Sequence, residues 1–163
     1  MDRLILLRHA KAVSDAPSGD DFDRPLAPRG QREASAVGER LAALGLAPDL
    51  ALVSPALRTR ETWELVEQVV PGAEVRFDPA LYNAEAGAIR RLAEKAGKGR
   101  GAVIVVAHNP GLQELTVQLL RDGAAPAEFL ARAQRHFPPA AVAVFDIGAA
   151  GRPAADRLFY PEK

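Results

Sequence analysis

Cysteine is absent from the 163-residue sequence. Without thiols the chain cannot form disulfides, use a thiolate nucleophile or bind a metal ion through cysteine. Long apolar runs are also missing, and no segment is long enough for the core of a signal peptide or for a membrane-spanning helix. These absences lead us to expect a cytoplasmic protein with no membrane partner.

The sequence has no net charge either, because its 21 basic side chains are matched by 21 acidic ones. A neutral chain generates no global field that would attract nucleic acid, so any anion site must be local. Only 4 of the basic residues are lysines and 17 are arginines, so an arginine needs positional support before it counts as functional. At this length we expect one domain that spans residues 1–163.

Short apolar runs alternate with amphipathic segments along the chain. Runs rich in branched side chains predict strands, most of them buried. The expected strands comprise residues 4–7, 50–53, 74–77, 102–107 and 141–147. This alternation predicts an α/β fold, a three-layer sandwich in which helices flank a mostly parallel central sheet.

The segments between these strands have the features of helices. Apolar residues recur at helical spacing from Ala34 to Leu44, and Gly45 is a suitable stop. Ser54 is expected to cap the next helix and Pro55 to occupy its first turn. The sequence pattern is weaker in the last third of the chain. There we expect an irregular segment 122–139 with a short helical piece around 129–133, and a hairpin-like turn over 148–156.

Basic side chains follow three of the expected strands. Arg8 and His9 end the first strand, His108 directly follows the uninterrupted apolar strand 102–107, and Arg58 lies in the first turns of the helix after the second strand. In open α/β sheets, ligands bind in the crevice outside the carboxyl ends of the strands. The sequence therefore predicts a local anion site there, with phosphate as the first candidate. Taken alone, Arg8-His9 could also be just the polar end of a strand.

The motifs around these residues resemble those of a known family. Leu7-Arg8-His9-Ala10 resembles the Arg-His-Gly signature of the histidine phosphatase superfamily, which has the phosphoglycerate mutase-like fold. Ser54 to Thr62 resembles its second motif, and Ala107 to Gly111 its second-histidine motif. Asp23 to Leu26, followed by Arg29-Gly30, is similar to the branch named after the phosphohistidine phosphatase SixA. Ala10 stands where the family has glycine, and alanine would be strained there if the position needs a positive φ.

The resemblance implies an enzyme and a role for each of four residues. His9 would attack phosphorus and form a phosphohistidine intermediate. Arg8 and Arg58 would clamp the phosphoryl oxygens, and His108 would stabilise the charge on them. Arginines supply the positive charge, so we expect no cofactor and no metal ion; His9 and His108 also lack the spacing of zinc motifs.

Three further residues are candidates for substrate contacts. Asn109 belongs to the second-histidine motif. Arg24 is either a phosphate contact or a surface arginine before a turn. Glu85 is the nearest counterpart of the glutamate with which larger relatives protonate the leaving oxygen, but a carboxylate also suits the start of a helix. The identity of a general acid therefore stays open at this point.

The leaving group favours one substrate class. An alkoxide benefits strongly from a general acid, whereas imidazole, with a pKa of about 6.5, leaves easily without one. The chain also lacks the large insertions that cover small substrates in bigger relatives. We expect a phosphohistidine phosphatase whose partner is a phosphorylated protein such as a histidine phosphotransfer domain, acting as a monomer or weak dimer. The alternatives are a phosphatase of a small metabolite and an inactive phosphate-binding module.

Overall fold

The computed structural model describes residues 1–162 and confirms the expected α/β sandwich. The strands are β1 Arg3–Arg8, β2 Leu50–Val53, β3 Glu74–Phe77, β4 Ala102–Ala107, β5 Val142–Ile147 and β6 Pro153–Phe159. The helices are α1 Pro28–Ala43, α2 Leu57–Val69, α3 Ala86–Ala96, α4 Gly111–Asp122 and α5 Ala127–Arg135, with short 3-10 turns at Asp21–Asp23 and Pro79–Leu81. No helix within residues 1–162 has the length and apolar character needed to cross a bilayer.

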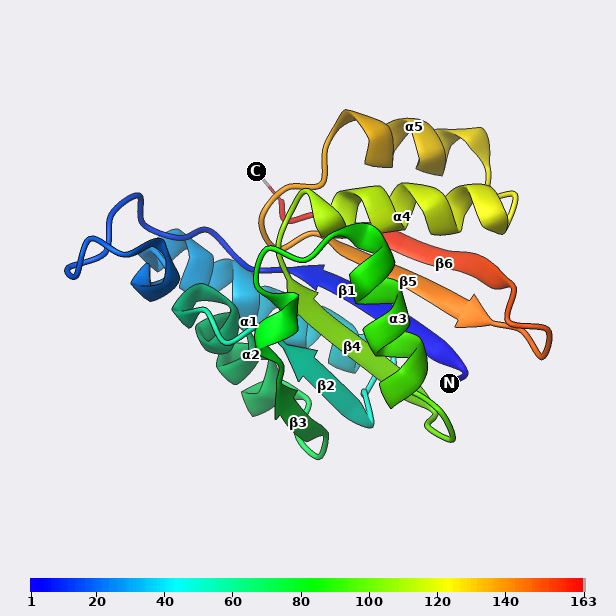
Figure 1. The fold of residues 1–163 in the computed structure, drawn as a ribbon, viewed down its shortest axis with the longest axis horizontal. Coiled ribbons are helices and arrows are strands. Elements are labelled where there is room, and N and C mark those ends of the chain that lie inside the picture. Colours follow the sequence, from blue (N-terminus) through cyan, green and yellow to red (C-terminus); the bar gives the residue numbers. More distant parts are fainter. Residues whose placement is uncertain (163) are drawn as a thin grey trace.

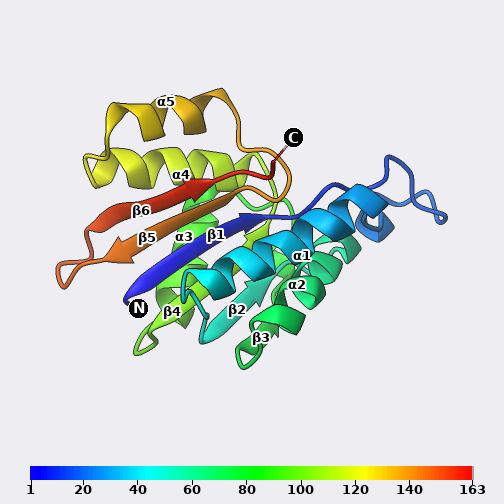
Figure 2. The same ribbon diagram turned by 180° about the vertical axis from the view of Figure 1, so that it is seen from behind.

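One mixed, mostly parallel sheet forms the middle layer, with strand order β3-β2-β4-β1-β5-β6. Strands β1 to β4 pair in parallel, while β5 runs antiparallel to β1 and β6 antiparallel to β5. Helices α3, α4 and α5 cover one face (Figure 1), and α1 and α2 cover the other (Figure 2). The architecture is thus helix, sheet, helix.

Strand β1 shows why the central strands have continuous apolar sequences. Its side chains alternate between the faces, and both faces are buried. Leu4 and Leu6 pack in the cluster under α3 and α4, whereas Ile5 and Leu7 pack in the cluster under α1 and α2. The apolar run must therefore end where the strand leaves the two helical layers, at Arg8.

The carboxyl ends of three neighbouring strands meet at one edge of the sheet. Strand β4 lies between β2 and β1. The backbone N–H of His9 donates to the carbonyl oxygen of Ala107, and that of Ser54 donates to the carbonyl oxygen of Val106. These bonds hold the residues that follow the three strands at the same level of the sheet. The sheet topology thereby places His9, Ser54 and His108 side by side.

The start of α2 differs from the prediction. The helix begins at Leu57 with Ala56 as its N-cap residue, and Ser54 and Pro55 lie outside it. The Ser54 hydroxyl bonds to the ring of His108 and accepts from the N–H of the N-cap residue Ala56, so it caps no N–H within the helix. A serine followed by proline after a strand is typical of a helix N-cap. In this protein the serine hydroxyl instead accepts a hydrogen bond from His108 in the candidate site.

Two predictions for the last third of the chain were too conservative. Helix α5 covers Ala127–Arg135, a longer segment than the expected 129–133. Residues 153–156 belong to strand β6 and not to a turn, so β5 is not the last strand. Strand β6 lies at the sheet edge, where a first-position proline and exposed polar residues are tolerated, and a register shift between Val144 and Phe145 interrupts its alternation.

Candidate active site

The structure brings the four predicted catalytic side chains together in one cluster, in which Arg8 is partly buried and the other three are buried. Arg8 and His9 come from the end of β1, Arg58 from the first turn of α2, and His108 from the end of β4. The ring centroids of His9 and His108 are 5.4 Å apart. His9, Arg58 and His108 are only 7%, 4% and 4% exposed. Ionisable groups so deeply buried at the mouth of a sheet are typical of a functional site.

The ring of His9 is held in one tautomer. Its Nδ1 lies 2.8 Å from the carbonyl oxygen of Ala10. A carbonyl only accepts hydrogen bonds, so Nδ1 carries the proton and Nε2 keeps its lone pair. Burial lowers the pKa of His9 to about 3 and outweighs the opposing effect of the Ala10 hydrogen bond. At neutral pH, His9 is therefore an uncharged imidazole with a free Nε2, which is the form a nucleophile needs.

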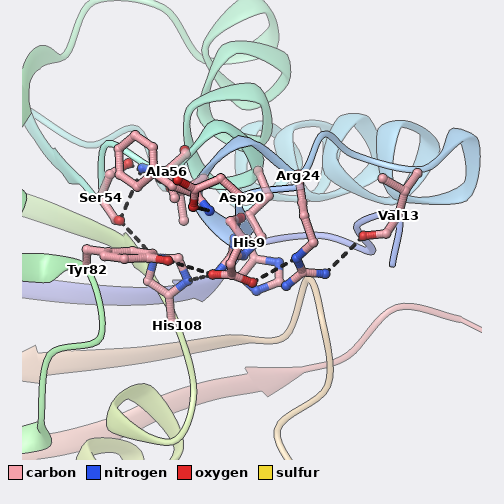
Figure 3. A network of polar contacts seen from close by, with 12 residues as sticks. His9, Val13, Asp20, Arg24, Ser54, Ala56, Tyr82 and His108 are labelled. Atoms are coloured by element: carbon pink, nitrogen blue, oxygen red, sulfur yellow. Dashed lines mark hydrogen bonds and ion pairs between the residues drawn. The ribbon is translucent and has the colours of Figure 1, made fainter. Parts of the chain in front are cut away.

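His108 has the opposite tautomer. Its Nδ1 lies 3.3 Å from Arg58 Nη2, which can only donate, so Nδ1 accepts. Its Nε2 carries the proton and donates to Ser54 Oγ at 2.8 Å (Figure 3). Burial and then the positive charge of Arg58 lower the pKa of His108 to about 4. An anion beside this ring would favour its protonated form and make Nδ1 a donor.

Two guanidinium groups surround the histidines. Arg8 Nη1 donates to the carbonyl oxygen of Phe137 at 3.0 Å, and Arg58 Nη1 donates to that of Asp21 at 2.8 Å. Within the described residues 1–162, the Nε atoms of both arginines are buried without a hydrogen-bond partner. Burial, followed by repulsion from Arg58, lowers the pKa of Arg8. Repelling cations with spare N–H groups favour the binding of an anion with several oxygens.

Asp21 and Tyr82 also belong to the site, although neither is predicted from the sequence. Asp21 Oδ2 accepts from Arg58 Nη2 at 3.1 Å and from the Tyr82 hydroxyl at 2.6 Å. The Tyr82 bond is the main cause that lowers the pKa of Asp21 to about 2, and Asp21 in turn raises the pKa of Tyr82. Figure 3 shows the Tyr82 ring beside His108, at a centroid distance of 5.5 Å. No sequence signal marks Asp21, because it stands in a polar loop among several carboxylates.

The three candidate substrate residues have different surroundings. Arg24 is joined to the site through Asp21 Oδ1, 2.9 Å from its Nε, while its Nη1 donates to the Val13 carbonyl (Figure 3). Asn109 Nδ2 donates to the same Phe137 carbonyl that holds Arg8. Glu85 is the exposed N-cap residue of α3, and within residues 1–162 its side chain makes no hydrogen bond or ion pair. Asn109 therefore supports the position of Arg8, and Glu85 stands apart from the cluster.

Alanine is compatible with position 10. Ala10 is not among the residues with positive φ, so no glycine is required there. Its backbone N–H donates to Thr62 Oγ1, whose hydroxyl donates to the Arg58 carbonyl. This relay ties the loop after β1 to helix α2. Glycine is required instead at position 30, where a Cβ would overlap the carbonyl oxygen of Lys11.

Comparison with known proteins agrees with the geometry. The family model of the histidine phosphatase superfamily (branch 1) matches residues 4–137. The uncharacterised protein Rv1276c of Mycobacterium tuberculosis is 34% identical over 142 residues, which cover 86% of this chain and 87% of that protein. The uncharacterised chloroplastic protein At3g52155 of Arabidopsis thaliana is 45% identical over 84 residues, 50% of this chain but only 38% of that longer protein.

Solved structures give the same result. A candidate phosphohistidine phosphatase SixA from Agrobacterium tumefaciens has a TM-score of 0.84 at 29% identity, covering 98% of both chains. The corresponding protein from Nakamurella multipartitia has a TM-score of 0.85 at 29% identity, covering 98% of this chain and 96% of that one. The chain therefore belongs to the histidine phosphatase superfamily, in its SixA-like branch, and has the phosphoglycerate mutase-like fold.

Proposed function

We propose that this protein removes phosphate from phosphohistidine in a signalling protein, through a phosphohistidine intermediate on its own His9. The observation that carries the proposal is the state of His9. Its Nδ1 is tied to the Ala10 carbonyl, and its neutral Nε2 is free beside two arginines. This arrangement supports nucleophilic attack on a phosphoryl group and supplies positive charge without a metal ion.

The reaction takes place in two displacements. In the first, the lone pair of His9 Nε2 forms a bond to phosphorus, the bond to the leaving group breaks, and the leaving group takes the electron pair. Arg8 and Arg58 hold the phosphoryl oxygens, and the bound dianion raises the pKa of His108 so that it takes up a proton at Nδ1 and donates it to an oxygen. In the second, a water oxygen forms a bond to phosphorus and the bond from phosphorus to His9 Nε2 breaks, leaving its electron pair on Nε2. The proton that water loses leaves with the phosphate product or the solvent, and the ring of His9 is neutral again.

The protonation states at the site support phosphohistidine over a phosphate ester. Asp21 is ionised, since its pKa is about 2, and the raised pKa of Tyr82 keeps the proton on its hydroxyl. Neither group has a pKa near neutral pH, which a general acid needs to protonate an alkoxide efficiently. Imidazole needs no such acid, because its pKa lies near 6.5. The similarity to SixA proteins over nearly the whole chain also supports this substrate.

The partner is then a phosphorylated protein, for example a histidine phosphotransfer domain. The test compares phosphate release from a phosphohistidine-bearing protein and from an aryl phosphate, by wild type and by His9→Ala. Fast loss of phosphohistidine with slow ester turnover, both abolished by His9→Ala, is the expected result. Fast ester turnover with phosphohistidine untouched would overturn the proposal in favour of a metabolite phosphatase. Inactivity on both, with phosphate still bound, would favour a binding module.

A further inference from the structure

We propose that Asp21 selects phosphohistidine as the substrate by accepting a hydrogen bond from the N–H of the leaving imidazole. This role rests on the proposed function, because it concerns the leaving group of the first displacement. Nothing in the family motifs includes Asp21, and it is the one carboxylate in direct contact with the catalytic cluster within the described residues.

The position of Asp21 suits the leaving group. In an in-line displacement the leaving atom lies opposite the nucleophile. His9 forms the floor of the site and is 7% exposed, so the leaving group must point outward to the mouth. Asp21 lies at that mouth, on the loop after β1, with its side chain 51% exposed and one oxygen on Arg58. Its carboxylate thus lies between the phosphate-binding arginine and the solvent.

The Asp21 carboxylate also has acceptor capacity to spare. A carboxylate offers about four acceptor positions. Oδ2 uses two of them, for Arg58 and the Tyr82 hydroxyl, whereas Oδ1 uses one, for Arg24 Nε. One position on Oδ1 remains, and three fixed donors hold the group in place. A carboxylate held in this way is ready to accept one more N–H without rearrangement.

The chemistry of phosphohistidine needs such an acceptor. When the distal ring nitrogen carries a proton, breaking the bond from nitrogen to phosphorus releases neutral imidazole, and without that proton it releases an anion. An ionised carboxylate beside the N–H favours the protonated ring. The electron pair of the broken bond then stays on the nitrogen that held phosphorus, and the N–H proton stays in place. The Ala10 carbonyl does the same for Nδ1 of His9 when the intermediate is hydrolysed.

The same carboxylate disfavours phosphate esters. An ester leaving group develops negative charge on oxygen and offers no N–H, so it would face the charge of Asp21. Asp21 then discriminates between the two substrate classes in two ways: its carboxylate attracts the N–H of a leaving imidazole and repels the charge on a leaving alkoxide. The walls beside Asp21 also suit a flat ring. Tyr82 packs edge-on against Phe22 at a centroid distance of 5.2 Å, which gives the mouth an aromatic side.

The test measures the ratio of kcat/KM for a phosphohistidine peptide to kcat/KM for p-nitrophenyl phosphate. In Asp21→Asn this ratio should fall at least about tenfold, as expected when a charge-assisted hydrogen bond is lost. Asp21→Glu, which keeps the charge, should retain more of the preference than Asp21→Asn. The matched control is Asp23→Asn on the same 3-10 turn. Within residues 1–162 the Asp23 carboxylate accepts from Ser18 and makes no hydrogen bond or ion pair with the cluster, so its replacement should leave the ratio unchanged.

The outcomes separate the two proposals. If wild type removes phosphate from the peptide but Asp21→Asn lowers both activities by the same factor, Asp21 only positions Arg58 and the selective role is wrong. If the ratio is unchanged, the role is also wrong. If wild type fails to act on the peptide while it hydrolyses the aryl phosphate, the proposed function itself is overturned.

Discussion

The Ser54 hydroxyl and the His108 ring form a hydrogen bond of 2.8 Å, although the two residues are 54 positions apart in the sequence. Both are buried, and the bond fixes which nitrogen of His108 carries the proton. Nδ1 is thereby directed to Arg58 and toward the proposed phosphate position. Ser54 is a positioning residue that acts through His108.

Ser54→Ala tests this role. The substitution leaves the buried Nε2–H of His108 without an acceptor, which should lower the free energy of unfolding by about 1–3 kcal/mol. We also expect kcat/KM to fall about tenfold and its pH profile to shift, because His108 is no longer held in one tautomer. Thr116→Ala is the matched control, since it removes a buried hydroxyl whose one hydrogen bond among the described residues lies within α4. Equal activities of the two variants would contradict the role.

The stability of the fold should depend on pH through His9 and His108. Their folded-state pKa values of about 3 and about 4 lie below the value of about 6.5 for an unfolded chain. Below pH 6.5 the unfolded state therefore binds protons that the folded state does not, and stability falls as the pH drops toward the folded values. At pH 5 the loss is about 2 kcal/mol for each histidine.

Urea unfolding at pH 7.5 and pH 5 measures this loss. The variant that carries both His9→Asn and His108→Asn should lose much less stability between the two pH values than wild type does. The carboxylate of Asp21 does not contribute in this range, because the stability it provides is lost only as the pH falls from 3.8 to about 2. An equally steep loss in the double variant would show that the burial of these histidines is not the cause.

Gly30→Ala should destabilise the protein. A Cβ at Gly30 would overlap the Lys11 carbonyl, where α1 meets the loop after β1. Relieving this overlap requires a backbone shift, which costs about 1–3 kcal/mol. Gly87→Ala is the matched control in the first turn of α3, where the nearest atom is the flexible end of Arg91. Thermal melts should show a lower Tm for Gly30→Ala and an unchanged or higher Tm for Gly87→Ala.

Glu85→Gln should leave the hydrolysis of phosphohistidine and of aryl phosphate unchanged. The Glu85 side chain is exposed at the start of α3 and makes no hydrogen bond or ion pair with the cluster in the described structure. Steady-state kinetics on both substrates test this expectation. A selective drop in ester hydrolysis would instead identify Glu85 as a general acid and favour a metabolite phosphatase.

The sequence was sufficient to predict the parts of the molecule that depend on periodicity and strand order. Buried strands have continuous apolar runs, and parallel strands place the residues that follow them at one edge. The sequence alone is therefore enough to group Arg8, His9, Arg58 and His108 at this edge. Strand β6 is harder to predict, because an edge strand with a register shift has little alternation.

The contacts that orient these residues could not be predicted. Phe137 contributes a backbone carbonyl, which carries no side-chain signal, yet it holds both Arg8 and Asn109. Asp21 lies in an aperiodic loop whose path depends on tertiary contacts. The local sequence at Ser54 predicts a helix cap, because its bond to His108 depends on the neighbouring strand. Such contacts come from chain segments that meet only in the folded state.

The most direct test of the account is to trap the phosphorylated protein. Wild type and His9→Gln are mixed with excess phosphohistidine peptide, quenched in alkali, where phosphohistidine survives, and digested for mass spectrometry. We predict one phosphoryl group on His9 in wild type, formed and lost at rates that match turnover, and none in His9→Gln. Turnover of the peptide with no phosphoryl group on His9, or with His9→Gln still active, would contradict the account.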